Sequence, residues 1–277
     1  MKLDAHQHFW ALERGDYGWL TPELEPIYRD FRPGDLRPYL DRFGIEGTIL
    51  VQAAPTVAET RYMLSLADEN DFIRGVVGWV DFEAAEASDL IANLAGNPKL
   101  VGLRPMIQDI EDPDWMLRPD LVSAFEALIE HDLVFDALTL PQHLANLLKI
   151  AERHPGMRIV VDHGSKPHIA DGRMTGWAED MAAIARDTPA YCKLSGLVTE
   201  AGGNWTTETL RPYVEHLLDT FGPDRLIWGS DWPVCTLACS YEDWIGITYD
   251  LLRDLGDAER RAVLGGNAER VYLSKSA

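Results

Sequence analysis

Residues 158–164, Arg-Ile-Val-Val-Asp-His-Gly, contain the pattern on which the fold prediction rests. A short run of β-branched residues that is apolar on both faces is typical of a strand buried in a parallel sheet. An ionisable pair and a glycine follow, which indicates a turn. Counting this run, 158–163, the chain has eight such runs. The other predicted strands span residues 2–8, 47–53, 73–80, 100–106, 133–137, 190–195 and 225–230.

Helical patterns separate these strands. Residues 121–130 place Leu121, Phe125, Leu128 and Ile129 on one face. We also expect helices over residues 57–69, 141–153, 210–221 and 241–255. This alternation predicts one (β/α)8 barrel domain over residues 1–277, because such a barrel needs about 250 residues. A doubly wound sheet is the alternative, but it usually has fewer strands and carries a glycine-rich phosphate turn that this chain lacks.

Charge and cysteine content narrow the class of protein. The net charge is −20, from 45 acidic and 25 basic residues. Such a field repels phosphate backbones and anionic lipid, so we expect neither nucleic acid nor a membrane surface as a partner. Three cysteines cannot build a disulfide framework, and no signal peptide or membrane span is evident. The expected location is the cytoplasm.

The connection after the first strand is unusually long. Residues 9–35 show no clear periodicity. Loops of this length in compact domains are often functional, and in a barrel this one would lie over the active-site mouth as a lid. A plain surface insertion is the alternative.

Ionisable residues gather at the ends of three predicted strands. His6 and His8 end the first strand and, being two apart, share one of its faces. His163 ends the sixth strand, and Asp231 follows the eighth, which closes onto the first. Barrel enzymes place their catalytic groups at these carboxyl ends. The four residues are therefore the candidate catalytic set, although Asp231 alone is also compatible with a helix N-cap.

Other strand ends supply candidate substrate-binding residues. Arg104 can clamp a carboxylate or carbonyl oxygen, or form an ion pair with a neighbouring acid. Asp136 interrupts an apolar strand and therefore needs a partner inside the barrel. Lys193 is either that partner or a ligand for an anionic substrate. Gln52 and Trp10 complete the set, the latter as an aromatic face for a sugar ring.

The ordered motifs resemble a known family. They are HQHFW at 6–10, YGWL at 17–20, RDF at 29–31, GLRPMIQ at 102–108, VVDHGSKP at 160–167, CKLSGLVTE at 192–200 and RLIWGSDWPVC at 225–235. Together they are similar to the amidohydrolase superfamily, in the branch of sugar lactonases and pyrone-dicarboxylate lactonases. The resemblance runs from residue 1 to about Tyr272. It implies a distorted (β/α)8 barrel that hydrolyses a sugar-acid lactone.

The resemblance also implies roles for single residues. Asp231 matches the family's usual general base, and Arg104 matches a substrate-facing arginine. His6, His8 and His163 match its strand-end histidines. Hydrolysis of an aldonolactone by these residues is the leading hypothesis. A metal-dependent decarboxylase of the same branch and a barrel that binds sugar acids without turnover are the alternatives.

The metal content follows from the same comparison. His6, His8, His163 and Asp231 offer three imidazoles and one carboxylate, a set that suits one zinc ion. The bridging residues of the superfamily's two-metal sites have no match here. We therefore expect at most one divalent metal. Because Arg104 and Lys193 bring positive charge to the strand ends, we expect activity to survive removal of that metal.

Overall fold

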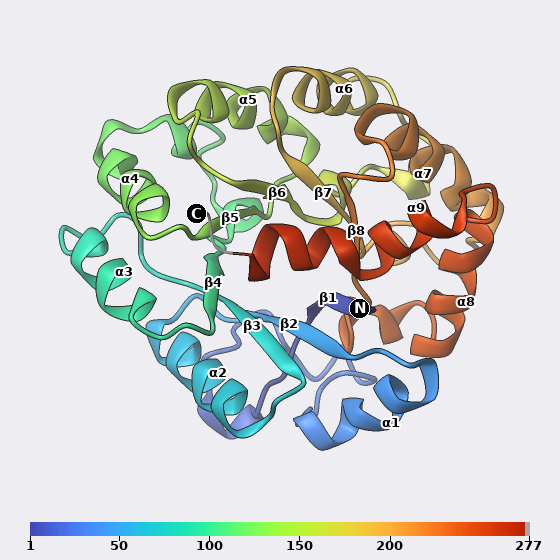
Figure 1. The fold of residues 1–277 in the computed structure, drawn as a ribbon, viewed down its shortest axis with the longest axis horizontal. Coiled ribbons are helices and arrows are strands. Elements are labelled where there is room, and N and C mark those ends of the chain that lie inside the picture. The colour runs from blue at the N-terminus through green and yellow to red at the C-terminus, as the bar shows by residue number, and fades with distance from the viewer. Residues whose placement is uncertain (275–277) are drawn as a thin grey trace.

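Eight parallel strands form one sheet in the order β1 to β8 in the computed structural model, which describes residues 1–274 (Figure 1). The strands are β1 (Leu3–Gln7), β2 (Gly47–Val51), β3 (Ile73–Gly78), β4 (Leu100–Leu103), β5 (Val134–Ala137), β6 (Ile159–Val161), β7 (Tyr191–Leu194) and β8 (Leu226–Trp228). Helices lie outside the sheet and connect successive strands (Figure 1). The predicted (β/α)8 barrel is confirmed, and the doubly wound sheet is excluded.

The outer helices are α1 (Pro33–Phe43), α2 (Val57–Glu69), α3 (Ala87–Ala95), α4 (Val122–Glu130), α5 (Leu144–Arg153), α6 (Trp177–Asp187), α7 (Thr207–Phe221), α8 (Tyr241–Leu251) and α9 (Asp257–Arg261). Helices α1 to α8 each bury residues on one face, whereas none of the residues of the short α9 is buried. Side-chain caps fix two of the starts. Thr56 accepts a hydrogen bond from the backbone N–H of Glu59 at 3.1 Å, and Ser240 accepts one from Asp243 at 3.0 Å.

A narrow seam closes the barrel between its first and last strands. The N–H of Asp231 donates to the carbonyl of His6 at 2.7 Å, and the N–H of His8 donates to that of Trp232 at 2.7 Å. Both bonds lie just beyond the end of β8. A Cβ at position 229 would lie 2.6 Å from the Cβ of His6, so glycine is required there for the two backbones to approach. The seam therefore brings the ends of β1 and β8 together.

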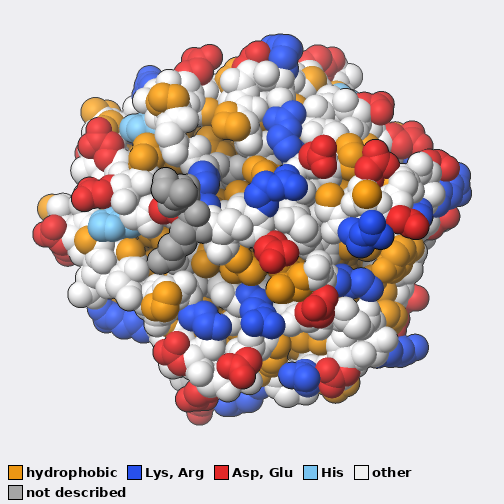
Figure 2. Space-filling model, in the orientation of Figure 1, with side chains coloured by type: hydrophobic (Ala, Val, Ile, Leu, Met, Phe, Trp, Pro, Cys, Tyr) orange, Lys and Arg blue, Asp and Glu red, His pale blue; other side chains and the backbone are white. Residues whose placement is uncertain are grey.

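The end of the chain covers the opposite mouth of the barrel. Two π-helical segments, Ala262–Gly266 and Glu269–Leu273, follow α9 across the amino ends of the strands (Figure 1). We call residues 262–273 the C-terminal cover. Its Val271 and Tyr272 pack with the inward-facing residues of the strands. Figure 2 shows acidic and basic side chains interspersed over this face.

Several predicted boundaries were wrong. Residues 141–143 form a 3-10 turn before α5, the predicted helix over 241–255 ends at Leu251, and α7 begins three residues earlier than predicted. The helices α1, α3, α6 and α9 were not predicted, and α1 contains two prolines and Gly34, which are poor helix formers. Pro33 nevertheless fits, since it occupies the first turn, where the backbone N–H has no partner within the helix.

The long segment after β1 is ordered by hydrogen bonds between its own residues. Trp10 pairs with Phe31 through two backbone hydrogen bonds of 3.0 and 2.9 Å. A short 3-10 turn, Leu12–Arg14, lies between them. Within residues 1–274, no helix has both the length and the apolar character needed to span a membrane.

Candidate active site

The histidines of β1 face the centre of the barrel mouth. His6 is fully buried and His8 is nearly so. Their ring centroids are 5.0 Å apart, and that of His163 lies 4.4 Å from the ring of His6. The structure therefore brings the three predicted histidines together.

Two members of this group have a backbone that L-residues seldom adopt. His163 has φ of 53° and Asp231 has φ of 58°. Left-handed conformations at non-glycine residues cost free energy and are often found at functional sites. Contacts hold the His163 ring in place: Nδ1 lies 2.9 Å from the hydroxyl of Ser195. A Cβ at position 196, where φ is also positive, would lie 2.5 Å from that nitrogen, so Gly196 makes room for the ring.

Asp231 is the carboxylate at the centre of the imidazoles. Its Oδ1 lies 3.2 Å from Nε2 of His8 and 3.7 Å from Nε2 of His6. Burial opposes ionisation, but the surrounding His163, His8 and His6 rings hold the pKa of Asp231 below its usual value. Asp231 is therefore ionised at neutral pH.

The imidazoles of His6 and His163 are neutral at neutral pH. Burial lowers the pKa of His163 to about 4. Burial also lowers the pKa of His6 well below its usual value, and the nearby Lys193 ammonium adds to this effect. A neutral imidazole can bind a metal or exchange a proton with a substrate.

A divalent metal fits this arrangement. Ligand atoms of His6, His163 and Asp231 lie within 4.8 Å of one another. His8 adds a second indication. Its Nδ1 lies 2.7 Å from the carbonyl of Val51, which can only accept, so Nδ1 must donate. In a neutral His8 ring, the Nε2 lone pair then faces Oδ1 of Asp231, and the two acceptors need a proton or a cation between them.

Arg104, at the end of β4, is buried and fully engaged. Its Nε and Nη2 donate to the side-chain oxygen of Gln52 at 3.0 and 2.6 Å. Its Nη1 lies 3.1 Å from Asp162 and 3.3 Å from Nε2 of His6. The guanidinium thus forms the ion pair with a strand-end acid and also reaches the site. Gln52 fixes its plane, since the Gln52 carbonyl accepts a further bond of 2.5 Å.

Asp136 and Lys193 lie beneath the site. Nζ of Lys193 is 2.5 Å from Asp136 and 2.9 Å from Asp162, and all three side chains are fully buried. Lys193 is therefore the partner that Asp136 needs. Asp162 was not predicted as a site residue, although like Asp136 it is a carboxylate at the end of an apolar strand.

A pocket of about 200 Å³ opens above these residues. Of the predicted site residues, His8, Arg104, His163 and Asp231 line it. Trp19, Gln108, Asp109 and Lys166 also line it and were not predicted. Gln52 and Trp10 lie behind the wall, and the indole N–H of Trp10 donates to the carbonyl of Arg29 at 2.7 Å.

Trp19 takes the place at the pocket that was expected for Trp10. Its indole N–H donates to the carbonyl of Ala53 at 2.6 Å. The ring centroids of the two tryptophans are 5.6 Å apart, so Trp10 supports Trp19 from behind. The fold of the segment 9–35 decides which ring reaches the pocket, and no local motif indicates it.

Comparison with known proteins shows the family of this chain. The model of the amidohydrolase family matches residues 3–273, almost the whole chain. The chain belongs to the amidohydrolase family. The resemblance inferred from its motifs is thereby confirmed.

Relatives of this amidohydrolase include two named lactonases. An L-fucono-1,5-lactonase from Burkholderia ambifaria is 46% identical over 98% of this chain and 95% of the relative. An L-fucono-1,5-lactonase from Burkholderia multivorans is 34% identical over 98% and 96%. A crystal structure of an amidohydrolase from Burkholderia multivorans with bound zinc superposes with a TM-score of 0.93, at 34% identity and covering 99% of both chains.

Proposed function

We propose that this amidohydrolase, acting as one domain, hydrolyses the lactone of a sugar acid to the open-chain acid. The observation that carries the proposal is an ionised carboxylate, Asp231, beside neutral imidazoles and a fixed guanidinium at the wall of a small pocket. The similarity to two L-fucono-1,5-lactonases supports a six-carbon sugar lactone as the substrate.

Asp231 acts as the general base. Its carboxylate accepts a proton from water while the water oxygen attacks the lactone carbonyl carbon. The ring C–O bond then breaks, and the proton passes from Asp231 to the departing alkoxide oxygen. The contact with His8, whose Nε2 lies 3.2 Å from Oδ1, keeps the carboxylate in one direction during both transfers. Because a carboxylate that ionises so readily is a weak base, Asp231 depends on its position next to the water to accept the proton.

Arg104 and the histidines stabilise the negative charge that develops on the carbonyl oxygen. Arg104 is held in one orientation by Gln52 and Asp162, so little reorganisation accompanies the reaction. Because its N–H groups already have partners in Gln52, Asp162 and His6, the guanidinium acts through its fixed positive charge. Trp19, at the outer wall of the pocket, offers an aromatic face to the sugar ring.

A single divalent ion, with zinc the best match to the ligands, would be held by His6, His163 and Asp231, with His8 beside them. Such an ion polarises a carbonyl oxygen when it is bound. The zinc-containing relative supports this part of the proposal. The permanent charges of Arg104 and Lys193 support activity without the ion.

A panel of sugar lactones tests the proposal directly. Purified protein is added to L-fucono-1,5-lactone, other aldonolactones and a pyrone dicarboxylate, and acid release is followed with a pH indicator. We expect the highest kcat/KM with a sugar lactone. No hydrolysis of any lactone, with either metal-free or zinc-loaded protein, would exclude the function. Release of CO2 from an aromatic acid, abolished by chelation, would instead show a decarboxylase.

A further inference from the structure

A column of buried polar side chains runs from the active site down through the barrel. Nζ of Lys193 contacts Nδ1 of His6 at 3.2 Å, and it contacts Asp136 and Asp162 below and beside it. None of these four side chains is exposed. The column ends at Tyr272, whose hydroxyl donates to Oδ1 of Asp136 at 2.6 Å.

Tyr272 comes from the C-terminal cover, on the opposite side of the barrel from the pocket. Its ring lies beneath Nζ of Lys193, 5.3 Å from ring centroid to nitrogen. Burial and the nearby Asp136 carboxylate raise the pKa of Tyr272 well above its usual value, so the hydroxyl keeps its proton and remains a donor. The two oxygens of Asp136 are thereby divided, one accepting from Tyr272 and the other from Lys193.

We propose that Tyr272 is a positioning residue for the active site, acting through Asp136 and Lys193 on His6. Without the Tyr272 hydroxyl, Oδ1 of Asp136 would be buried with no other described partner. Among the described residues, Lys193 is the cation in contact with Asp136 and can compensate. Movement of Nζ toward Asp136 then weakens its contact with His6, whose ring lies 3.7 Å from the base, Asp231. This inference rests on the proposed function for its kinetic readout.

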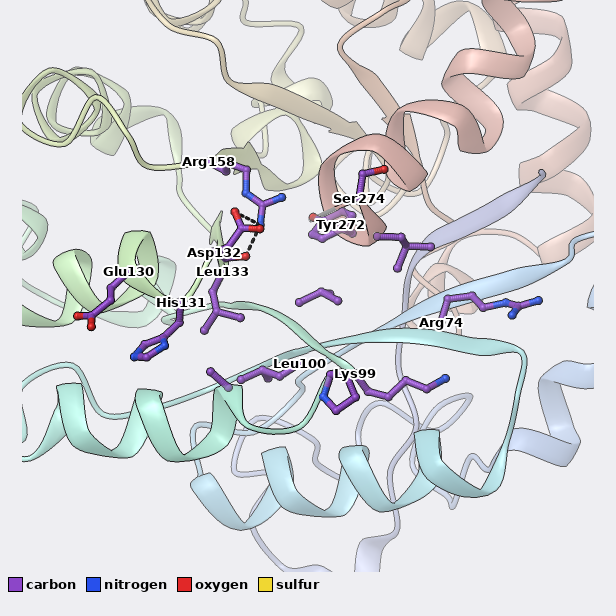
Figure 3. Close-up of a pocket in the computed structure, with 14 residues that line it drawn as sticks. Arg74, Lys99, Leu100, Glu130, His131, Asp132, Leu133, Arg158, Tyr272 and Ser274 are labelled. Carbon is purple, nitrogen blue, oxygen red and sulfur yellow. Dashed lines mark hydrogen bonds and ion pairs between the residues drawn. The ribbon is translucent and has the colours of Figure 1, made fainter. Parts of the chain in front are cut away.

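The surroundings of Tyr272 allow its hydroxyl to be tested apart from its ring. Figure 3 shows Tyr272 beside a second pocket, of about 570 Å³, at the base of the barrel. Arg158 forms an ion pair with Asp132 there (Figure 3). Arg158 also donates to the carbonyl of Val271 at 2.7 Å, which holds the cover in place. Tyr272→Phe keeps the ring that separates this pocket from the column and removes only the hydroxyl.

A matched control lies in the same segment. Asn267 donates from Nδ2 to the carbonyls of Pro223 and Leu226, both at 2.7 Å. It anchors the C-terminal cover without touching the buried column. Asn267→Ala therefore loosens the cover and lowers stability, as Tyr272→Phe does, but leaves the column intact.

The first experiment compares kcat, KM and unfolding midpoint for both variants on the best lactone substrate. We expect Tyr272→Phe to lower kcat about 10-fold with little change in KM, as is typical when a partner of a functional side chain is removed. Asn267→Ala should change kcat less than about 2-fold at a similar loss of stability. Equal effects of the two variants on kcat would overturn the proposal, because they would show a structural role alone.

A double-mutant cycle tests the route through Asp136. Asp136→Asn keeps an acceptor for the hydroxyl but removes the charge that holds Lys193. In this background Tyr272→Phe should lower kcat less than about 2-fold. A full 10-fold loss there would show that Tyr272 does not act through Asp136.

An NMR measurement separates this proposal from the lactonase proposal. In protein labelled with ¹⁵N-histidine, Tyr272→Phe should shift the ring nitrogens of His6, whereas Asn267→Ala should not. Unmoved His6 signals would overturn the positioning role even in an active lactonase. An absence of lactone hydrolysis by the wild type would overturn the proposed function and leave the NMR test intact.

Discussion

His8 and Asp231 meet across the closure of the barrel, with Nε2 of His8 3.2 Å from Oδ1 of Asp231, although 223 positions separate them in sequence. The carbonyl of Val51 fixes the other nitrogen of the His8 ring at 2.7 Å. Three strands, β1, β2 and β8, therefore determine the direction of one carboxylate. The proposed general base is oriented by the fold rather than by its own loop.

Replacement of this base should abolish turnover. Asp231→Asn keeps the shape of the side chain but cannot accept a proton from water, so kcat should fall about 10²–10⁴-fold. Asp109, another carboxylate that lines the pocket, serves as the control position. Asp109→Asn should change KM more than kcat. More than about a tenth of wild-type kcat in Asp231→Asn would show that another group is the base.

Arg104 should not tolerate lysine. The guanidinium contacts Gln52, Asp162 and His6 at once, and an ammonium on a flexible stem cannot reproduce this planar set. We expect Arg104→Lys to lower kcat/KM at least about 100-fold. Arg37→Lys, at an exposed position, is the control. Near-normal kinetics in Arg104→Lys would leave the arginine with a purely structural role.

Much of this site was predictable because strand ends in a barrel converge. His6, His8, His163, Asp231 and Arg104 were all found from one rule, that polar residues following apolar strands meet at the same mouth. The rule does not determine how deep in the barrel a side chain lies or whether it faces the pocket. Asp136 and Lys193 satisfy it equally well but lie beneath the pocket as an ion pair.

Chelation tests the place of the metal in catalysis. Protein stripped of metal, with the loss checked by elemental analysis, should retain lactone hydrolysis within about 10-fold, because Arg104 already supplies fixed positive charge. Zinc added back should bind at one equivalent per chain. A loss of more than about 10²-fold that zinc or manganese reverses would show that the metal itself activates the carbonyl or the water.

A buried acid at the seam should make stability depend on pH. Asp4 accepts hydrogen bonds from the N–H of Ser230 and from Tyr241, at 2.8 and 3.1 Å. Burial nevertheless raises its pKa from 3.8 to about 6. Because the folded pKa exceeds the unfolded one, this group lowers stability as the pH rises from about 4 to 6, by about 3 kcal/mol in total.

Asp4→Asn removes that dependence. The free energy of unfolding of the variant minus that of the wild type should therefore increase by about 2.5 kcal/mol between pH 4 and pH 7. Chemical denaturation at each pH measures it. Asp254→Asn, at a side chain that is 95% exposed, is the control. A constant difference across this range would mean that Asp4 is ionised throughout.

The helices and the lining of the pocket show where sequence patterns stop being informative. The helix α1 was not predicted, and a proline such as Pro33 favours a helix only where it falls in the first turn, which the sequence pattern did not locate. Trp19 was overlooked and Trp10 preferred, because only the path of a non-periodic segment decides which indole reaches the pocket. Lid motion over the pocket stays a prediction for that segment.

The seam between β1 and β8 should determine which part of the barrel unfolds first. Among the described residues, two backbone bonds at the level of His6 and Asp231 join the strands there, together with a few contacts of the Asp4, Ser230 and His8 side chains. Mild denaturant should part this seam before the helices melt, so hydrolysis should disappear at a lower urea concentration than circular dichroism does. Coincident midpoints would instead show that the closure is as durable as the rest of the molecule. If hydrolysis disappears first, the active site of the enzyme lies at the part of the fold that opens first on unfolding.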